Sequence, residues 1–370
     1  MKTEQLRFKN GTFTTQPALA DADLVLTFGE SDEFRSGSFY SELKKAYPQA
    51  NIVGCSSSGS ILANTISHDD CVVTAIKFEK STIKVVKSDI ANPSESKQTA
   101  IKLAKELESA GLKHILVISE GLGVNGSELA DGFNEASSVT SSGGLAGDGT
   151  SFASTVVMSN DTAKANCVTA IGLYGDMVVK TGSFAGFDEF GVEKIVTKSV
   201  DNVVYEIDNE PALDMYKRYL GDEADGLPMS GLYFPIAIKE HENSKPLIRT
   251  LLAIDDEAKS LTFAGTIKQG CTLKLMKSNI DNLVENAALA ADSAKIQESF
   301  NGGLCLAVSC VGRMIIMKQL VEEELDEVQN KLPDGVAITG FYSYGELAPH
   351  TGLKECSLHN QTMTLTAIYE

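Results

Sequence analysis

The sequence predicts an α/β protein with mixed sheets, built from two related units that pack together. Three observations support this fold class. Apolar, β-branched strands alternate with amphipathic helices, the order of these elements repeats after about 190 to 200 residues, and 43% of the 370 residues are apolar. A chain of this length and composition can bury a substantial core and form two domains. We expect the domains to cover residues 1–200 and 201–370.

The first unit begins with an apolar run at residues 24–30, which predicts a buried strand. From about Ser94, apolar residues recur every three or four positions until Gly111, which predicts an amphipathic helix and its end. The same two periodicities predict the other elements of this unit. They are a helix at 32–47, strands at 51–55, 71–79 and 82–88, a strand at 114–119, a helix at 127–136, and strands at 154–159 and 167–174.

The second unit repeats the order of the elements from residue 71 onward, which is strand, strand, helix, strand, helix, strand, strand. The repeat places Ser119 opposite Ser309 and Gly147 opposite Gly345. Each unit would then be a mixed sheet with its helices on one face, and the two helix-free faces would pack together or line a cleft. Its predicted elements are strands at 251–255 and 260–263, helices at 280–296 and 318–332, and strands at 304–309, 336–344 and 358–368, the last two of which we expect to form a hairpin.

Charge and composition exclude several classes of partner. A net charge of −18 disfavours binding to nucleic acid or to an anionic membrane surface. Residues 1–10 lack the apolar segment of a secretory signal, and no run approaches the ~18 apolar residues that a spanning helix needs. We therefore expect a cytoplasmic protein without membrane insertion. Its seven scattered cysteines form no Cys-x-x-Cys pair, which predicts buried thiols rather than disulfides or a zinc site.

The candidate binding residues lie where predicted strands end in small or polar residues. The segments 55–60, 143–148 and 342–346 could converge at the carboxyl ends of sheet strands, where ligands commonly bind in α/β proteins. Arg313 follows a buried strand and could bind a ligand carboxylate, or it could pair with Glu346. The predicted ligand-binding residues are Cys55, Ser56, Gly143, Gly144, Gly147, Asp148, Arg313, Tyr342, Tyr344 and Glu346.

Catalysis is not indicated by the motifs of this chain. It has no Gly-x-Ser-x-Gly or Walker A sequence, and the glycine-rich segment 143–147 is not followed by a predicted helix. We predict that the protein is not an enzyme; the alternative is a hydrolase with Ser57 or Cys310 as its nucleophile. The histidines lack zinc-ligand spacing, so the one metal role we consider is a haem axial ligand, for which His241 and His350 are the candidates.

Five short motifs are spread over nearly the whole chain. They are Val53-Gly54-Cys55-Ser56, Gly143-Gly144-Leu145-Ala146-Gly147-Asp148, Tyr205-Glu206-Ile207-Asp208 with Pro211-Ala212-Leu213, Gly345-Glu346-Leu347-Ala348-Pro349, and His359-Asn360-Gln361-Thr362. These motifs resemble those of the FIST domain family and stand in the family's order. The resemblance implies an intracellular sensory module that binds a small ligand and informs a separate signalling partner, such as a histidine kinase or a cyclic-di-GMP enzyme.

The ligand stays open between two alternatives at this point. The chain is similar to the free-standing bacterial nitric-oxide-sensing haem proteins of the family, which regulate a kinase that governs biofilm behaviour. The general proposal for the family is instead an amino-acid-like ligand without haem. His359 lies in the family-wide His-Asn-Gln-Thr motif, which indicates a shared structural role rather than a haem-specific one.

Overall fold

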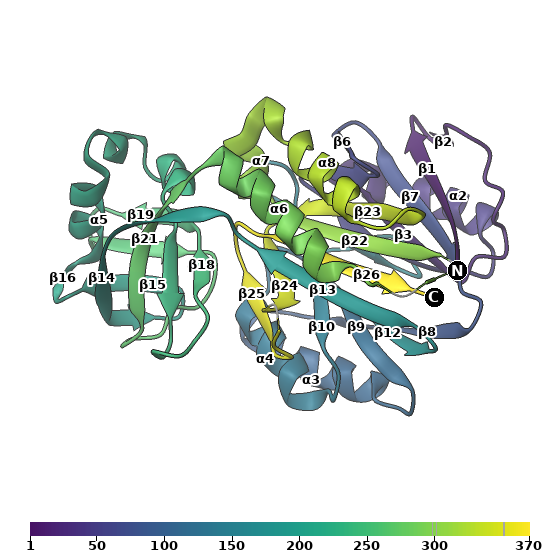
Figure 1. The fold of residues 1–370 in the computed structure, drawn as a ribbon, viewed down its shortest axis with the longest axis horizontal. Coiled ribbons are helices and arrows are strands. Elements are labelled where there is room, and N and C mark those ends of the chain that lie inside the picture. The colour runs from purple at the N-terminus through teal and green to yellow at the C-terminus, as the bar shows by residue number, and fades with distance from the viewer. Residues whose placement is uncertain (298, 301, 351) are drawn as a thin grey trace.

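Three α/β units and an inserted β-rich domain make up the chain (Figure 1). The computed structural model describes residues 1–370 apart from 298, 301 and 351. Its mixed sheets, with helices on one face of each α/β unit, confirm the predicted fold class. No helix among the described residues is long and apolar enough to span a bilayer.

The first unit is a six-stranded sheet with two short helices on one face. Its elements are β1 (Lys2–Lys9), β2 (Thr12–Phe13), β3 (Leu24–Gly29), α1 (Ser31–Arg35), α2 (Ser38–Ala46), β4 (Asn51–Ser56) and β7 (Cys71–Lys77), joined by β11 (Val157–Ser159). The strand order is β11-β4-β3-β7-β1-β2. β3 pairs β4 in parallel, and β7 pairs both β3 and β1 antiparallel. The predicted helix at 32–47 is interrupted between α1 and α2, at Ser36 and Gly37.

The second unit repeats that strand pairing. Its elements are β8 (Ser81–Asp89), α3 (Ser96–Leu107), β9 (Leu112–Ser119), α4 (Gly126–Ala136), β10 (Ser141–Leu145) and β12 (Cys167–Gly175), joined by β24 (Gly345–Pro349) and β25 (Cys356–His359). β9 pairs β10 in parallel, and β12 pairs both β9 and β8 antiparallel. β7 and β8, which are neighbours along the chain, therefore belong to different sheets.

The third unit has the same pairing again. Its elements are β13 (Val178–Phe184), α6 (Ile280–Ala294), β22 (Gly303–Cys310), α7 (Val311–Met317), α8 (Glu322–Lys331), β23 (Val336–Ser343) and β26 (Met363–Tyr369), joined by β5 (Ser60–Leu62) and β6 (Thr65–Ser67). β22 pairs β23 in parallel, and β26 pairs both β22 and β13 antiparallel. The predicted correspondence of Ser119 with Ser309 is correct, since both lie near the ends of equivalent strands, β9 and β22.

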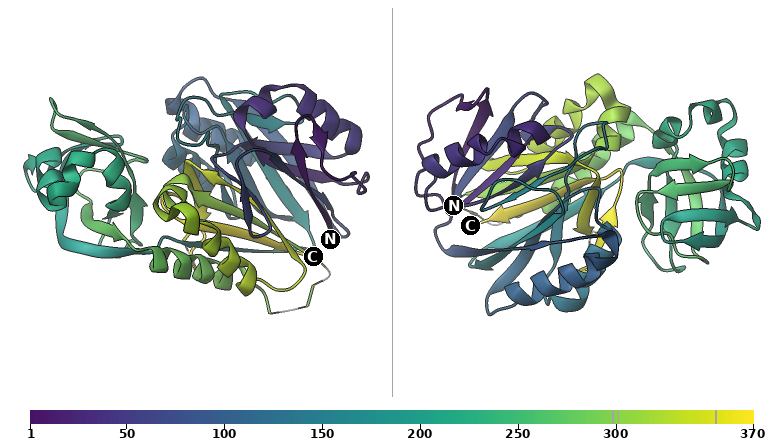
Figure 2. Two further views of the ribbon diagram at one scale, coloured as in Figure 1. Left: turned by 90° about the horizontal axis from the view of Figure 1, so that it is seen from above. Right: turned by 180° about the vertical axis from the view of Figure 1, so that it is seen from behind.

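Residues 187–278 form the inserted domain, between β13 and α6 of the third unit. Figure 2 shows it apart from the three units, and its first and last strands pair at Phe187 and Ser278. Its elements are β14 (Phe187–Val200), β15 (Val203–Ile207), β16 (Glu210–Pro211), α5 (Ala212–Leu220), β17 (Ile236–Lys239), β18 (Leu247–Arg249), β19 (Leu251–Asp255), β20 (Ser260–Phe263) and β21 (Thr272–Ser278). β19 and β20 are the two strands that the sequence placed at the start of the second repeat; that assignment is wrong, because β13 has this position.

The helix-free faces of the three sheets share one core. Leu26 of β3, Ile118 of β9 and Leu306 of β22 belong to the same buried cluster, and the rings of Phe28 and Phe341 stack across it at 4.7 Å. Alternate residues of each central strand face the helices instead. Because both faces of these strands are covered, their sequences are apolar throughout rather than alternating.

Each unit sends the segment after the second strand of its parallel pair into the sheet of another unit. β5 follows β4 and pairs with β23, β11 follows β10 and pairs with β4, and β24 follows β23 and pairs with β10. Three equivalent backbone hydrogen bonds link the crossing points, and we call them the strand-end ring. They run from Ser58 N to Tyr342 O (2.9 Å), from Gly147 N to Ser56 O (3.1 Å) and from Tyr344 N to Leu145 O (3.1 Å). The predicted convergence of three strand ends is therefore confirmed.

The predicted terminal hairpin exists in a shifted form. The chain leaves β23 at Tyr344, and β24 then pairs with β25, so that Glu346 lies opposite His359. The strand predicted at 358–368 is divided between β25 and β26, which belong to different sheets. The bend at Tyr344 separates the residues that we had expected on one hairpin.

Candidate functional site

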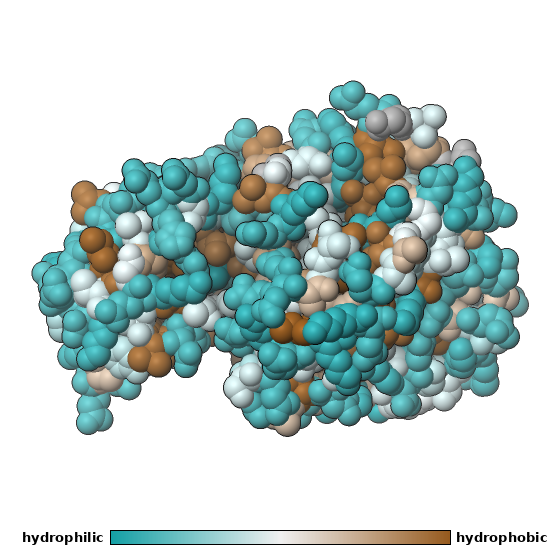
Figure 3. Space-filling view, turned by 90° about the horizontal axis from the view of Figure 1, so that it is seen from below, coloured by the Kyte–Doolittle hydropathy of each residue, from teal (hydrophilic) through white to brown (hydrophobic). Residues whose placement is uncertain are grey.

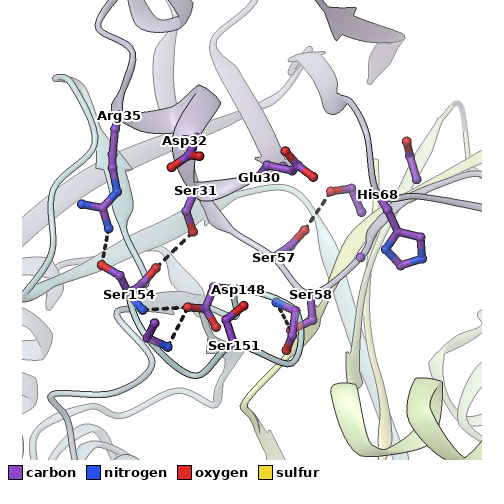
Figure 4. Close-up of a pocket in the computed structure, with 16 residues that line it drawn as sticks. Glu30, Ser31, Asp32, Arg35, Ser57, Ser58, His68, Asp148, Ser151 and Ser154 are labelled. Atoms are coloured by element: carbon purple, nitrogen blue, oxygen red, sulfur yellow. Dashed lines mark hydrogen bonds between the residues drawn. The ribbon is translucent and has the colours of Figure 1, made fainter.

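A cavity of about 710 Å³ opens beside the strand-end ring, at the carboxyl ends of β3 and β4. Residues 29–35, 57–60, 67–68 and 148–154 contribute to its walls, and we call it the polar cavity (Figure 4). The carboxyl edge of a parallel strand pair is where ligands commonly bind in α/β folds. The position and size of the cavity therefore suit a small-molecule site.

Three charged residues of α1 and its N-cap line the polar cavity. Glu30 occupies the N-cap position and Asp32 the first turn, and among the described residues neither carboxylate accepts a hydrogen bond. Arg35, in the last turn, donates to Ser154 Oγ, as Figure 4 shows. The cavity thus holds two unpaired carboxylates and one guanidinium group within a single helical segment.

Hydroxyl groups form most of the remaining wall. Ser57 and Ser60 are hydrogen-bonded to each other through their Oγ atoms at 2.8 Å, and Ser58 Oγ donates to Gly149 O at 3.2 Å. Ser31 Oγ donates to Ser154 O at 3.1 Å on the opposite loop. These residues are small, so the backbone can approach a bound molecule closely, and each hydroxyl can donate or accept.

Asp148 fixes the loop that closes the polar cavity. Its carboxylate accepts from Tyr344 Oη and from the backbone N–H groups of Ala153 (2.9 Å) and Ser154 (2.6 Å). Burial would raise the pKa of Asp148, but these hydrogen bonds outweigh burial and hold the pKa below its ordinary value. Burial and the Asp148 carboxylate raise the pKa of Tyr344, so Tyr344 stays a neutral donor.

Tyr344 connects this loop with the far side of the strand-end ring. Its ring stacks on Phe152 at 4.4 Å with an interplanar angle of 14°. The hydroxyl group faces Asp148 in the wall of the polar cavity, whereas the ring faces cavities beside the inserted domain. Asp148 and Tyr344 are thus the two predicted binding residues that the structure places on cavity walls and in mutual contact.

The other predicted residues of the first two units have backbone or packing roles. Cys55 lies in the common core, and Ser56 Oγ accepts from Val156 N at 3.0 Å while fully buried. A Cβ atom on Gly143 would lie 1.8 Å from Val117 O, and one on Gly144 would lie 2.6 Å from Val308 Cγ1. Gly147 belongs to the strand-end ring.

Arg313 is buried in a network of hydrogen bonds in which it pairs with Glu324. The predicted alternative, a pair with Glu346, is therefore wrong. Nε and Nη2 of Arg313 donate to Glu324 at 2.9 and 2.7 Å, and Nη2 also donates to Leu283 O. Tyr342 Oη donates to the same carboxylate at 2.6 Å. Arg313 and Tyr342 are fully buried and do not line the polar cavity.

Glu346 is also fully buried, in a separate group of hydrogen bonds. It accepts from Ser343 Oγ at 2.7 Å and from both N and Oγ1 of Thr362, at 3.1 and 2.9 Å. Burial raises the pKa of Glu346 to about 7 despite these donors. Glu346 therefore titrates inside the protein and does not line the polar cavity.

Sequence reasoning missed the residues of α1 that face the polar cavity. The sequence predicts Glu30 at the end of a strand and Asp32 and Arg35 within a helix, without a role at a site. The rule that identified the other strand ends would have found them, because Glu30 directly follows β3. Ser57, Ser58 and Ser60 belong to a segment that the sequence did predict.

The two haem candidates lie apart from the polar cavity. His241 is exposed in the inserted domain, and His350 lies edge-on to His359 at 4.7 Å between ring centroids. His350 borders a cavity of about 300 Å³ whose lining is strongly charged, with the acids Glu128, Asp131, Glu240 and Glu355 and the bases Lys245, Arg249 and Lys268. Among the described residues, neither histidine lines the mostly apolar cavity of about 390 Å³ beside Tyr344.

The two nucleophile candidates have no activating partner in the part of the chain that the structure describes. Ser57 Oγ is hydrogen-bonded to Ser60 Oγ, and it donates to no basic side chain among the described residues. Burial raises the pKa of the Cys310 thiol well above its ordinary value, which disfavours the thiolate. All seven cysteines are buried and free, which confirms the prediction of buried thiols.

Comparisons with known proteins identify related chains. The chain is 24% identical over 313 residues to an uncharacterised protein of Methanocaldococcus jannaschii, in a match that covers 77% of this chain and 59% of that relative. It thus spans less than two thirds of the relative's length. A cyanuric acid hydrolase from A. caulinodans is 11% identical, over 78% of this chain and 99% of that one, with a TM-score of 0.18, which is too low to indicate a shared fold.

Two family domains together match most of the chain. The FIST N domain matches residues 23–210, and the FIST C domain matches residues 212–349. The two matches meet at residues 210–212, within the inserted domain. The boundary that we predicted after residue 200 also lies in this domain, at the end of β14. The strand-end ring, the polar cavity and the inserted domain are thus features of a chain that belongs to the FIST family.

Proposed function

We propose that this protein is a sensor that binds a small zwitterion of the amino-acid type in the polar cavity and regulates a separate signalling partner. FIST domains are associated with small-ligand sensing in signalling proteins. The observation that carries the ligand assignment is that Glu30, Asp32 and Arg35 share one open cavity, with both carboxylates unpaired among the described residues.

These charges match the two ends of an amino acid. The guanidinium group of Arg35 can bind a carboxylate through two parallel hydrogen bonds. Glu30 and Asp32 can bind the ammonium group, which is a donor without acceptor capacity. The hydroxyl groups of Ser57 and Ser58 provide adaptable contacts for a polar side chain. Arg35 therefore takes the carboxylate-binding role that we predicted for Arg313.

A thermal-shift screen of the twenty free amino acids tests this assignment. For the amino acid with the largest shift, two matched compounds remove one charge each: the decarboxylated amine and the N-acetyl derivative. Because a hydrogen bond to a charged group contributes about 1.5–3 kcal/mol, each matched compound should bind roughly 10- to 100-fold more weakly. If no amino acid shifts the midpoint, or if both matched compounds bind as tightly as the amino acid itself, the proposed ligand class is wrong.

Two arginine variants locate the site. Arg35→Ala should weaken binding of the same amino acid by a factor of ten or more, because it removes the carboxylate partner. Arg218→Ala is the matched control, since Arg218 is a surface residue of the inserted domain that pairs with Glu210. Equal effects of the two substitutions would exclude the polar cavity as the site.

The loop at 148–154 offers a route from the polar cavity to a partner. Ser151 and Ser154 line the cavity, and Phe152, between them in sequence, is 45% exposed and stacks on Tyr344. A ligand that orders this loop would therefore change an exposed aromatic surface. The proposed partner is a histidine kinase or an enzyme that makes or degrades cyclic-di-GMP, as the family resemblance implies.

Haem-based sensing of nitric oxide stays a prediction. The candidate ligand His241 is exposed and His350 borders a cavity rich in carboxylates, so neither lies in the apolar surroundings that usually hold a macrocycle. Haem titration of the purified protein tests it. A Soret band that shifts with nitric oxide and is lost in His350→Ala would support haem sensing, and an unchanged free-haem spectrum would exclude it.

A further inference from the structure

A second cavity lies between the third unit and the inserted domain, on the other side of Tyr344 from the polar cavity. It has a volume of about 390 Å³, and we call it the junction cavity. The first residues of α7 form one wall, and β19 with the short helical turn at Met229–Tyr233 forms the other. The ring of Tyr344 lies in the same lining, and almost all the remaining side chains are apolar.

The mouth of the junction cavity is apolar and exposed. Four of the twelve large apolar side chains that are exposed among the described residues gather here, and Figure 3 shows apolar surface in the hollow beside the inserted domain. Isolated exposed apolar residues are normal on proteins, but a group around a cavity indicates a binding surface. These four are Leu122 (41% exposed), Phe152 (45%), Met229 (56%) and Leu252 (46%).

Two buried polar atoms in the lining lack hydrogen-bond partners among the described residues. They are Thr250 Oγ1 and Asn360 Oδ1, on side chains that are 5% and 1% exposed. Asn360 Nδ2 donates to His359 O at 3.0 Å, which leaves its Oδ1 atom as a free acceptor. An unpartnered buried polar atom costs roughly 1–3 kcal/mol, so such atoms usually have a partner in the working protein.

We propose that the junction cavity is a second ligand site, for a small and mostly apolar molecule that carries one hydrogen-bond donor. Apolar walls and the Tyr344 ring suit an aromatic or short aliphatic body, and Asn360 Oδ1 with Thr250 Oγ1 receives the donor. A phenol-type ring has this chemistry. The polar cavity is lined by charged side chains, whereas no carboxylate, lysine, arginine or histidine among the described residues lines the junction cavity.

Isothermal titration of the full chain with two isomers tests the proposal. 4-Ethylphenol and 4-methylanisole have the same atoms, but only the phenol has an O–H donor. One net hydrogen bond contributes about 0.5–1.5 kcal/mol, so the phenol should bind roughly 2- to 13-fold more tightly. Failure of both isomers to bind would show that the cavity holds only water and would overturn the proposal; equal binding would overturn the assigned donor contact.

Tryptophan substitutions place the bound probe. Leu252→Trp and Met229→Trp each fill the mouth of the junction cavity, and each should weaken 4-ethylphenol binding by tenfold or more. Leu320→Trp is the matched control, because Leu320 is 43% exposed and does not line this cavity. Arg35→Ala should leave phenol binding unchanged. Undiminished binding in both mouth variants would show that the probe binds elsewhere and would overturn the proposal.

Discussion

Arg313 and Glu324 form the most completely buried ion pair among the described residues, with both side chains 0% exposed. Ser309 Oγ and Tyr342 Oη donate to the same carboxylate at 3.0 and 2.6 Å. The sequence did not predict this pairing, because Glu324 belongs to the acidic run Glu322–Glu324, which has the composition of a solvent-exposed helix start. Only the packing of α8 against the third sheet shows which of the three acids is buried.

Breaking this pair should destabilise the protein strongly. Arg313→Met leaves a buried carboxylate without its counter-ion, which costs about 3–5 kcal/mol of unfolding free energy. Adding Glu324→Gln should recover more than about 1 kcal/mol, because the neutral amide can still contact Tyr342 without carrying a buried charge. Urea unfolding of both variants checks this. A loss below about 1 kcal/mol in Arg313→Met would contradict the buried network.

Glu346 should make stability depend on pH in a direction opposite to that of most acids. Its pKa is about 7 in the folded protein against an ordinary value of 4.5, so the folded state binds the proton more tightly. This contribution is complete below pH 4.5 and is lost as the pH rises through about 7. Relative to Glu346→Gln, wild-type protein should lose about 3 kcal/mol of unfolding free energy between pH 4.5 and 8.

Chemical unfolding of wild type and Glu346→Gln at several pH values measures this difference. The substitution keeps the side-chain shape while removing the titration, so other groups cancel in the comparison. A difference in unfolding free energy that stays constant across that pH range would show that Glu346 is ionised in the folded protein.

At the scale of elements, three glycines permit the close approach of the two strands in each parallel pair. Gly54, Gly143 and Gly340 occupy equivalent positions in β4, β10 and β23. A Cβ atom at these positions would lie 1.8, 1.8 and 1.7 Å from a carbonyl oxygen of the neighbouring strand. Only glycine avoids this overlap without a backbone shift.

Gly340→Ala should therefore lower the unfolding free energy by more than about 3 kcal/mol or prevent soluble expression, because the neighbouring strand must move. Gly226→Ala is the matched control: Gly226 is exposed, its Cβ atom would meet only the side chain of Ser230, at 3.1 Å, and the substitution should cost less than about 1 kcal/mol. Comparable urea midpoints for the two variants would rule out the close strand approach.

The sequence predicted most single elements but not their assignment to sheets. The runs that became β3, β9 and β22 are recognisable because apolar periodicity is local. The bend at Tyr344 was not predictable in this way, because β24 pairs with β10, which lies about 200 residues earlier in the chain.

At the scale of the whole molecule, the chain contains three equivalent units where the sequence showed two. The unit of β1 to β7 was not recognised as a separate repeat, because a loop between β1 and β3 replaces the helix that the other two units have at this position. The inserted domain further obscured the repeat by separating β13 from α6. The convergence of strand ends was predictable from their small residues, whereas the charged wall of α1 depended on how the first unit packs beside the ring.

This three-unit arrangement explains why the two cavities differ. Equivalent strand ends of the three units open beside one ring, yet each is lined by a different following segment. Serines and the charges of α1 line the polar cavity, and the apolar start of α7 lines the junction cavity. The hydroxyl group of Tyr344 donates to Asp148, which lines the polar cavity, and the same residue lines the junction cavity. Tyr344 is therefore the residue through which the two sites can influence each other.

Hydrogen exchange measured by mass spectrometry, with and without the amino acid that gives the largest thermal shift, tests the central claim most directly. The account predicts slower exchange in residues 30–35, 57–60 and 148–154, which form the polar cavity, and no such protection in Arg35→Ala at the same ligand concentration. Protection confined to the inserted domain, or identical protection in Arg35→Ala, would contradict a zwitterion site at the strand ends.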